Sequence, residues 1–320
     1  MSRSQATQAT TTAPGAMLAL ATIGFTVTFW GWALLSPLGA TLRDQLSLSS
    51  VEQSLLVAVP VVVGSLGRIP VGVLTDRLGA RLMFPAVALL TILPVLYLGH
   101  LADSLGEYLV GGFFLGLGGT TFAIGVPFVN SWYPPARRGL AIGVFGAGMG
   151  GTAISAFTTV QLADAVGPAF PFDLVAIALA IYAVVGRLLL RDRPDRVVPS
   201  GSATAGFVAA LRMPVTLQLS FLYAVAFGGF VAFSVYLPTY LGTAHGLAQS
   251  DAALRTAGFV VLAVAMRPVG GWLSDRLGPV PVLTATFACV AVLAVVASFE
   301  FPLTPARAAV FLTMAAALGA

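Results

Sequence analysis

Two arginines, Arg68 and Arg267, stand in long apolar runs of the sequence, and an aspartate follows each of them eight residues later. The surrounding segments, GRIPVGVLTDRLGAR and MRPVGGWLSDRLGP, have the same layout, and the second arginine and Asp275 each come 199 positions after their counterparts, Arg68 and Asp76. A guanidinium stays protonated, and its planar fork of donors matches a planar oxyanion at two points. Two arginines that no acidic side chain neutralises would therefore bind an anion between them.

The composition places these arginines in a membrane protein. Of the 320 residues, 58% are hydrophobic and 9% are charged, whereas about 25% of the residues in a soluble domain are charged. Many apolar runs reach the roughly 18 residues that a helix needs to cross a bilayer. Strands of a membrane barrel would be about 10 residues long and would alternate in polarity. The sequence therefore predicts an all-α bundle of membrane helices, and its net charge of +4 belongs to loops rather than to a nucleic-acid surface.

Ten helical spans are predicted from the apolar runs. They cover residues 15–40, 51–74, 82–101, 106–131, 139–161, 167–190, 214–241, 252–274, 280–299 and 305–320. The last run has about 16 residues and no polar flank, which is short for a membrane crossing. The chain is therefore expected to end within its tenth helix.

The longest polar interruption divides these spans into two groups. Residues 191–213 are predicted to link a six-helix half, 15–190, to an incomplete second half, 214–320, and to include a short helix near AGFVAALRM. The polar segment 1–14 is predicted to be a disordered tail. The arginine–aspartate motif recurs in the second helix of each half, and internal repeats of this kind are typical of transporters.

The arginines also indicate how the chain crosses the membrane. One set of loops and flanks carries eleven of them: Arg3, Arg77, Arg81, Arg137, Arg138, Arg187, Arg191, Arg193, Arg196, Arg212 and Arg276. The opposite loops carry three, which are Arg43, Arg255 and Arg307. Because cytoplasmic loops are enriched in basic residues, we expect the N-terminus to lie in the cytoplasm and the protein to lie in the inner (plasma) membrane of the cell.

Arg68 and Arg267 are predicted to lie deep in the bilayer. Each is about 12 Å of helix away from its aspartate at the cytoplasmic end, and half of the hydrocarbon core is about 15 Å. A central arginine costs roughly 2.5–3.5 kcal/mol to insert, so such residues mark a polar cavity on a substrate path. The alternatives are that the side chains snorkel to the interface or pair with a carboxylate.

The distribution of acidic residues argues against such pairing. All twelve lie in predicted loops or near the ends of spans: Asp44, Glu52, Asp76, Asp103, Glu107, Asp164, Asp173, Asp192, Asp195, Asp251, Asp275 and Glu300. A neutralising acid would then have to come from helices beyond residue 320. His100 and His245 stand in predicted outward loops, so no proton carrier is evident, and anion exchange or uniport is favoured over proton coupling.

The first copy of the motif resembles the loop signature of the major facilitator superfamily, roughly G-x-x-x-D-R-x-G-R-R. The matching residues are Gly72, Asp76, Arg77, Gly79 and Arg81, and Ala80 departs from the pattern. The resemblance implies a bundle of two six-helix halves that rock by alternating access. It also implies that Asp76 caps a neighbouring helix, span 11 of that arrangement, and stabilises one gating state. Asp275 and Arg276 are the corresponding pair in the second copy.

Three segments resemble the nitrate/nitrite porter family within that superfamily. They are GSLGRIPVG, MRPVGGWLSDRLG and FVNSWYPPARRGLAIGVFGAGMGGTAISAF. In that family an arginine from helix 2 and another from helix 8 clamp nitrate, and Arg68 and Arg267 occupy those places. Aromatic residues sandwich the flat anion, and by resemblance these are Phe122, Tyr223 and Phe227. The resemblance thus implies the transport of a small inorganic anion.

The run GVFGAGMGG in the fifth span resembles the glycine-rich nitrate signature of the family. Gly146 lies within it, and small residues let backbones or a small anion approach closely. The family usually has asparagine late in this run, where the present chain has Met149. A thioether cannot donate a hydrogen bond to an oxyanion. A facilitator for a small carboxylate such as oxalate or formate, or for another small solute, therefore stays open.

Other classes of function fit the sequence less well. A multidrug exporter would want an acidic residue inside the membrane, and a sensor would want a signalling module, which the short loops do not carry. No HExxH, Walker or CxxC motif appears, and the one cysteine, Cys289, lies in an apolar run. An enzyme, a cofactor and a metal site are therefore not expected. The expected partners are a small anion and the lipid bilayer, and we expect a monomer that binds no nucleic acid.

Overall fold

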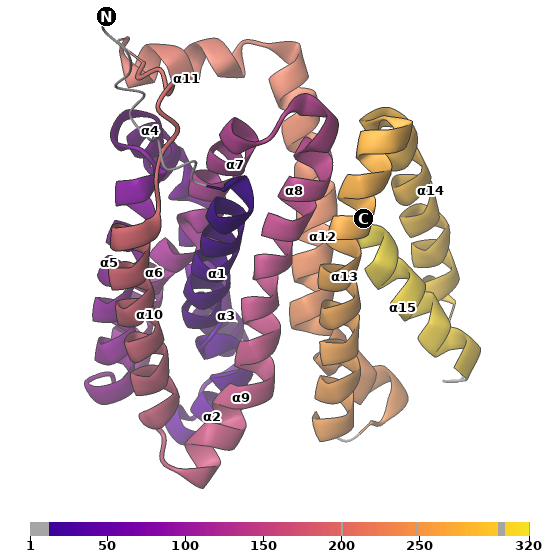
Figure 1. Cartoon of the computed structure of the whole chain (residues 1–320). Coiled ribbons are helices and arrows are strands. Elements are labelled where there is room, and N and C mark those ends of the chain that lie inside the picture. Colours follow the sequence, from indigo (N-terminus) through magenta and orange to yellow (C-terminus); the bar gives the residue numbers. More distant parts are fainter. Residues whose placement is uncertain (1–12, 200, 248, 300–304, 320) are drawn as a thin grey trace, which may run out of the picture.

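The computed structural model describes residues 13–199, 201–247, 249–299 and 305–319, which form helices and connecting turns without a strand (Figure 1). Residues 1–12 of the predicted tail, 1–14, lie outside the described residues. The α-helices are α1 (Pro14–Trp32), α2 (Leu35–Leu46), α3 (Ser50–Leu66), α4 (Arg68–Leu78), α5 (Ala80–His100), α6 (Leu105–Leu115), α7 (Thr121–Trp132), α8 (Arg138–Gly146), α9 (Gly151–Ala165), α10 (Phe170–Leu189), α11 (Ala203–Leu211), α12 (Pro214–His245), α13 (Gln249–Leu277), α14 (Pro279–Ser298) and α15 (Pro305–Gly319). Three 3₁₀ helices are η1 (Gly116–Thr120), η2 (Pro135–Arg137) and η3 (Ala147–Gly150).

Nine stretches of the described residues are long and apolar enough to cross a membrane. They are Pro14–Leu46, Ser50–Leu78, Ala80–His100, Leu105–Trp132, Pro135–Ala165, Phe170–Leu189, Pro214–Ser234, Leu254–Leu277 and Pro279–Ser298. These stretches match the first nine predicted spans in order, and the predicted all-α membrane fold is confirmed. The tenth predicted span falls on α15, a helix of 15 residues.

Four of these stretches consist of helices in series rather than one continuous helix. Ala33 and Leu34 separate α1 from α2, Gly67 separates α3 from α4, η1 separates α6 from α7, and η3 separates α8 from α9. The last three breaks are rich in glycine, which weakens a helix and allows close packing. A Cβ atom on Gly116, for example, would lie 2.6 Å from the Cβ of Val63. These three breaks therefore occur where backbones approach one another.

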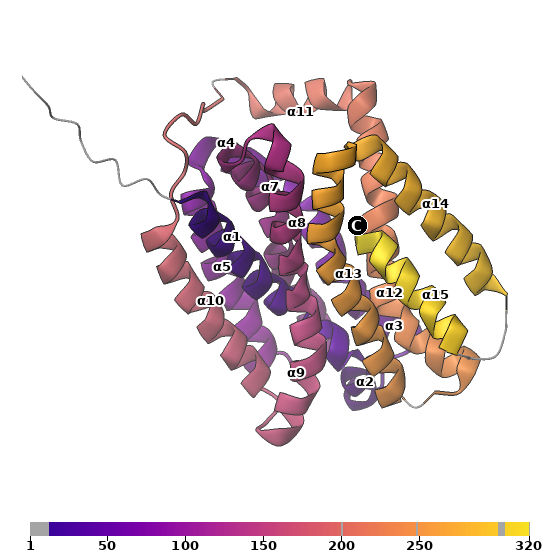
Figure 2. The ribbon, with the colours of Figure 1, turned by 45° about the vertical axis from the view of Figure 1, so that its right-hand side comes forward.

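The helices form two groups that meet along α8 and α13 (Figures 1 and 2). The first group consists of α1 to α10. Its central helix is α1, whose Phe25 and Phe29 are fully buried. Helices α12 to α15 make the second group. The backbones of α8 and α13 touch, because a Cβ atom on Gly139 would collide with the carbonyl of Gly271, and the converse also holds. Helix α11 lies across one end of the bundle in Figure 1, which we call the linker end, and the opposite end is the far end.

Helix α10 is apolar on its outer face as well as on its inner face. Val175 and Leu179 are fully buried, whereas Ile177, Ile181 and Val184 are 57%, 60% and 60% exposed. A helix that is apolar all round is stable in hydrocarbon and not in water. The outer surface of the first group is therefore suited to lipid.

A turn at the linker end occurs twice with the same backbone geometry. Gly79 has φ +84° and Gly278 has φ +88°, and each ends one helix and begins the next. Glycine adopts this left-handed conformation without the penalty that a Cβ atom brings. The two turns are 199 positions apart, as are the two arginines and the two aspartates. The sequence repeat is thus also a repeat of structure.

The linker begins with charged residues that bind helix ends in the first group. Asp192 accepts a hydrogen bond from the N–H of Ala80 at 2.9 Å, and Arg196 donates to the carbonyl of Asp76 at 3.0 Å. A carboxylate at a helix N-terminus and an arginine at a C-terminus both complement the helix dipole. Helix α11 then forms where the sequence predicts a short helix. That residues 191–213 link two halves of the protein stays a prediction.

Replacing Asp192 with alanine is expected to lower the free energy of unfolding by about 1 kcal/mol, because the carboxylate caps the N-terminus of α5. The measurement is unfolding of the purified protein in detergent, followed by tryptophan fluorescence. Asp195→Ala is the matched control, since Asp195 pairs with Arg193 at an exposed surface, where such pairs contribute little. Equal losses in the two variants would contradict the capping role.

Candidate functional site

Arg68 begins α4, directly after the glycine that separates it from α3. This junction packs closely on η1, because a Cβ atom on Gly67 would lie 2.9 Å from Cγ2 of Thr120. The Nε of Arg68 donates to the carbonyl of Gly119 at 3.4 Å, and its Nη1 donates to the hydroxyl of Tyr223 on α12 at 3.1 Å. The arginine is therefore held by one neutral group from each group of helices.

Aromatic rings surround the guanidinium of Arg68. Its Cζ lies 4.8 Å from the ring centroid of Phe227 and 5.4 Å from that of Phe122, both within cation–π range. The ring of Tyr223 stacks on each of these rings, at 5.4 Å from Phe227 and 5.8 Å from Phe122. The three aromatic residues predicted for the site therefore lie together beside Arg68, although they come from α7 and α12.

Arg267 lies on α13 where this helix packs against α8. Its backbone carbonyl contacts Gly143, and a Cβ atom on Gly146 would lie 3.2 Å from its Cδ and 3.4 Å from its Nη1. Its Cζ lies 5.7 Å from the ring centroid of Phe230. Its Nε is buried and has no hydrogen-bond partner in the described part of the chain. The glycines of α8 thus leave room for a buried cation that has a free donor.

Both arginines lie against one face of α12. Tyr223, Phe227 and Phe230 are spaced four and three residues apart, which places them on the same side of the helix. Arg68 lies against the first two, and Arg267 lies against the third. The structure therefore brings the two predicted cations to one helix face, although they are far apart in the sequence and belong to different groups of helices.

Neither arginine takes part in an ion pair within the described residues. The ion pairs found there are His100–Asp173, Arg193–Asp195 and Arg255–Asp251. A carbonyl, a hydroxyl and aromatic rings surround the guanidiniums instead. Of the twelve acidic residues, Glu300 falls outside the described part of the chain. The described surroundings of both arginines therefore leave their charges uncompensated.

The remaining predicted binding residue, Met149, is buried on η3 with 1% of its surface exposed. Gly146, three residues earlier, lies against Arg267. Sequence reasoning missed Phe230. Its position three residues after Phe227 on an α-helix was a signal that could have found it.

The second copy of the predicted gating motif joins the two groups of helices at the linker end. The carboxylate of Asp275 accepts hydrogen bonds from the N–H groups of Gly139 and Leu140, both at 2.8 Å. It thereby caps the N-terminus of α8 from the neighbouring group, which is a favourable position for a negative charge. Arg276 lies over the ring of Trp272, at 4.3 Å from its centroid.

The first copy of the motif makes different contacts. Asp76 is exposed, and Arg77 donates to the carbonyl of Gly201 at 3.3 Å. The N–H of Arg81 donates to the linker carboxylate that caps α5. A Cβ atom on Gly72 would meet nothing within 4 Å. Capping of a further helix by Asp76 therefore stays a prediction.

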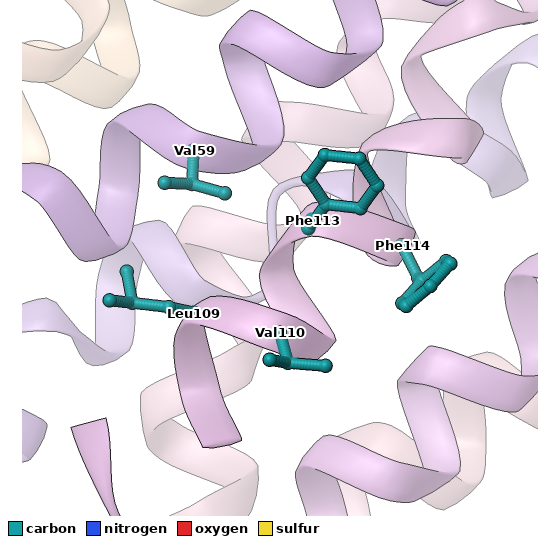
Figure 3. Close-up of a pocket in the computed structure, with 5 residues that line it drawn as sticks. All are labelled: Val59, Leu109, Val110, Phe113 and Phe114. Carbon is teal, nitrogen blue, oxygen red and sulfur yellow. The ribbon is translucent and has the colours of Figure 1, made fainter. Parts of the chain in front are cut away.

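Neither arginine lines either of two hollows in the described structure. One, of about 340 Å³, is lined by Val59, Leu109, Val110, Phe113 and Phe114 (Figure 3). The other, of about 590 Å³, lies between α13 and the first group and is lined by Thr26, Ala147, Gly150, Ala153, Ile154, Phe157, Thr158, Val261, Val264 and Ala265. The first has only apolar lining side chains, and the second has two hydroxyls that bond to carbonyls of their own helices. Neither is suited to a charged ligand.

Comparison with known proteins gives consistent matches over most of the chain. The model of a family described as the Major Facilitator Superfamily matches residues 21–320. The probable nitrate/nitrite transporter NarK2 of Mycobacterium tuberculosis (strain ATCC 25618 / H37Rv) is 50% identical over 307 residues, which cover 95% of this chain and 78% of that protein. The nitrite extrusion protein of Bacillus subtilis (strain 168) is 40% identical over 283 residues, which cover 88% and 71%.

Solved structures share the fold at low sequence identity. The proton:xylose symporter XylE, bound to 6-bromo-6-deoxy-D-glucose, superposes with a TM-score of 0.67 at 14% identity, over 96% of this chain and 79% of that one. A bacterial homolog of the human lysosomal transporter Spinster, in an inward-facing and occupied conformation, gives 0.62 at 18% identity, over 95% and 72%. At these identities the likeness concerns the fold alone.

Proposed function

The chain belongs to the major facilitator superfamily, in which it is most like the nitrate/nitrite porters, and we propose that it transports nitrate or nitrite through a site between Arg68 and Arg267. Its relatives are transporters and not enzymes, and the chain is a multi-pass membrane protein. The proposal concerns the substrate, the binding residues and the way in which the protein moves.

The observation that carries the proposal is the pair of guanidiniums without an acidic partner among the described residues. Arg267 has a buried Nε–H with no acceptor in the described part of the chain, which is costly unless a ligand supplies one. The hydroxyl of Tyr223 accepts a hydrogen bond from Arg68, so its own proton remains available to an anion. A small oxyanion would satisfy these donors and reduce the repulsion between the two cations.

The aromatic residues favour a flat anion over a bulky one. Phe122 and Phe227 lie on the Arg68 guanidinium, and Tyr223 stacks on both rings. Aromatic rings that present parallel faces would accept a thin planar ligand between them more readily than a bulky one. Nitrate and nitrite are planar and carry oxygens that the arginine fork can engage at two points.

Alternating access would follow from the division of the site between two groups of helices. Arg68 and Arg267 belong to different groups, and Asp275 ties the groups together at the linker end. The hollow of about 590 Å³ lies between α13 on one side and α1, η3 and α9 on the other. In this proposal the structure represents a state that is closed at the linker end.

The proposed orientation places the linker end in the cytoplasm of a cell whose inner membrane holds the protein. Arginines of the linker and of the nearby helix ends gather there, including Arg77, Arg138, Arg193 and Arg196. This agrees with the enrichment of basic residues on the cytoplasmic side of membrane proteins. The state described above is then closed towards the cytoplasm.

Transport by the purified protein in liposomes tests the function directly. Nitrate or nitrite is expected to enter the liposomes at a saturable rate and to exchange for internal nitrite. Formate and oxalate are the competing cargoes, because Met149 offers no hydrogen-bond donor where the related porters usually have asparagine. Uptake of formate or oxalate without uptake of nitrate or nitrite would replace the proposal with the carboxylate function.

Gly146→Ala is expected to raise the nitrate KM by about tenfold, because the new methyl group would displace Arg267 by a few tenths of an ångström. Gly150→Ala is the matched control. A Cβ atom at that position would meet only Cγ1 of Val264, at an ordinary contact distance of 3.5 Å. The two variants are compared by nitrate uptake into liposomes, and a KM that is unchanged in both would remove Gly146 from the site.

A further inference from the structure

A buried ring lies against the second arginine of the proposed site. The side chain of Phe230 is 2% exposed, and the Cζ of Arg267 lies 5.7 Å from its centroid. This distance falls within the roughly 6 Å range of cation–π attraction. The ring of Phe259 stacks on that of Phe230, with the centroids 6.5 Å apart, and is tilted against that of Phe233, at 5.7 Å. The ring beside Arg267 is therefore held in a packed aromatic cluster.

We propose that Phe230 is a positioning residue for anion transport. Its ring holds the guanidinium of Arg267 at a fixed position relative to the guanidinium of Arg68, which lies against Phe227. This inference rests on the proposed function of the site. Phe227 and Phe230 are three residues apart on α12, and each lies against one of the arginines. The rigid spacing of a single helix turn thus fixes where the two cations meet the anion.

A ring suits this task better than an acidic residue does. A carboxylate beside Arg267 would neutralise its charge and occupy the donors that an anion needs. The face of a phenylalanine attracts a cation through its quadrupole and accepts none of the guanidinium's strong hydrogen bonds. The Nε of Arg267, buried and without an acceptor among the described residues, agrees with this division of roles.

The packing also explains why Arg267 depends on this contact more than Arg68 does. Arg68 has two hydrogen bonds, to Gly119 and to Tyr223, besides its ring contacts. Arg267 lies against the Phe230 ring and the bare backbone of Gly146. Loss of the Phe230 ring face would leave the second guanidinium free to turn, whereas the first would keep its hydrogen bonds.

The test replaces Phe230 with phenylalanines that carry one, two or three fluorine atoms. Fluorination weakens the negative face of the ring and leaves its shape nearly unchanged, so packing and cation–π attraction are separated. The nitrate KM for uptake into liposomes is expected to rise stepwise with fluorination, to about tenfold for the trifluorinated ring, at an unchanged unfolding temperature. The same series at Phe233, whose ring packs at a tilt against Phe259, is the matched control, and the KM is expected to stay unchanged along it.

The outcomes separate this inference from the proposed function. If the wild-type protein carries nitrate and the Phe230 series is flat, Phe230 has a packing role only and the inference is wrong. If the series rises equally at Phe230 and Phe233, a general effect on the cluster is responsible, which also overturns it. If the wild-type protein neither binds nor transports nitrate or nitrite, the function proposed for the site fails first, and the inference fails with it.

Discussion

Replacing Arg267 with lysine is expected to reduce nitrate transport by about 10- to 100-fold. Lysine keeps the positive charge but loses the planar fork of donors that a flat oxyanion can engage at two points. A hydrogen bond to a charged group contributes roughly 1.5–3 kcal/mol, and the variant loses at least one such bond to the anion. The initial rate of nitrate uptake into liposomes gives the transport rate, and calorimetry on the purified protein gives the affinity for nitrate.

Arg255→Lys is the matched control for this experiment. Arg255 lies on the same helix, and its exposed side chain pairs with Asp251, so transport is expected to change less than about twofold. Arg68→Lys is expected to act in the same direction as Arg267→Lys. Because both arginines would hold one anion, the fold loss of transport in the double variant should be smaller than the product of the fold losses in the two single variants. Transport by Arg267→Lys at more than a tenth of the wild-type rate would argue against the site.

Replacing Asp275 with alanine is expected to open the linker end. The carboxylate accepts two hydrogen bonds at 2.8 Å from the N-terminus of α8, so its loss removes a charged contact between the two groups of helices. Loss of these hydrogen bonds to the carboxylate should shift the equilibrium between closed and open states towards the open state by roughly 10- to 100-fold.

Pulsed electron paramagnetic resonance can measure this opening with spin labels at two exposed positions. Arg137 on η2 and Leu277 at the end of α13 lie in different groups at the linker end, and Cys289→Ala removes the native thiol. The population of long distances should increase in Asp275→Ala. Asp251→Ala, on the same helix towards the far end, should leave the distance distribution unchanged. An unchanged distribution in Asp275→Ala would show that the cap does not hold the groups together.

The order and type of the first nine membrane helices could be predicted because lipid imposes a strong requirement on sequence. Backbone groups in hydrocarbon must be satisfied within the helix, so long apolar runs have few alternatives. The breaks within spans were not predicted, since η1 and η3 depend on which glycines face another backbone. Gly116, packed against Val63, illustrates this, because the sequence does not reveal that neighbour.

The candidate site was predictable where charge was the signal and less so where packing decided it. Arg68 and Arg267 stood out because a guanidinium is costly in a bilayer, and the structure brings both to α12. Phe230 did not stand out, since phenylalanine is ordinary in an apolar helix. The cap that Asp275 provides for α8 was likewise hidden, because it joins residues 135 and 136 positions apart.

The attachment of the linker to the first group has a consequence for cutting the polypeptide. Asp192, Arg193 and Arg196 all bind helix ends of that group, whereas Val197, the next residue, is 86% exposed. A protease site inserted after Val197 would therefore leave those contacts on the N-terminal fragment. Since α8 and α13 touch along their backbones, the two fragments should stay associated after digestion, and separately encoded pieces should assemble in the same membrane.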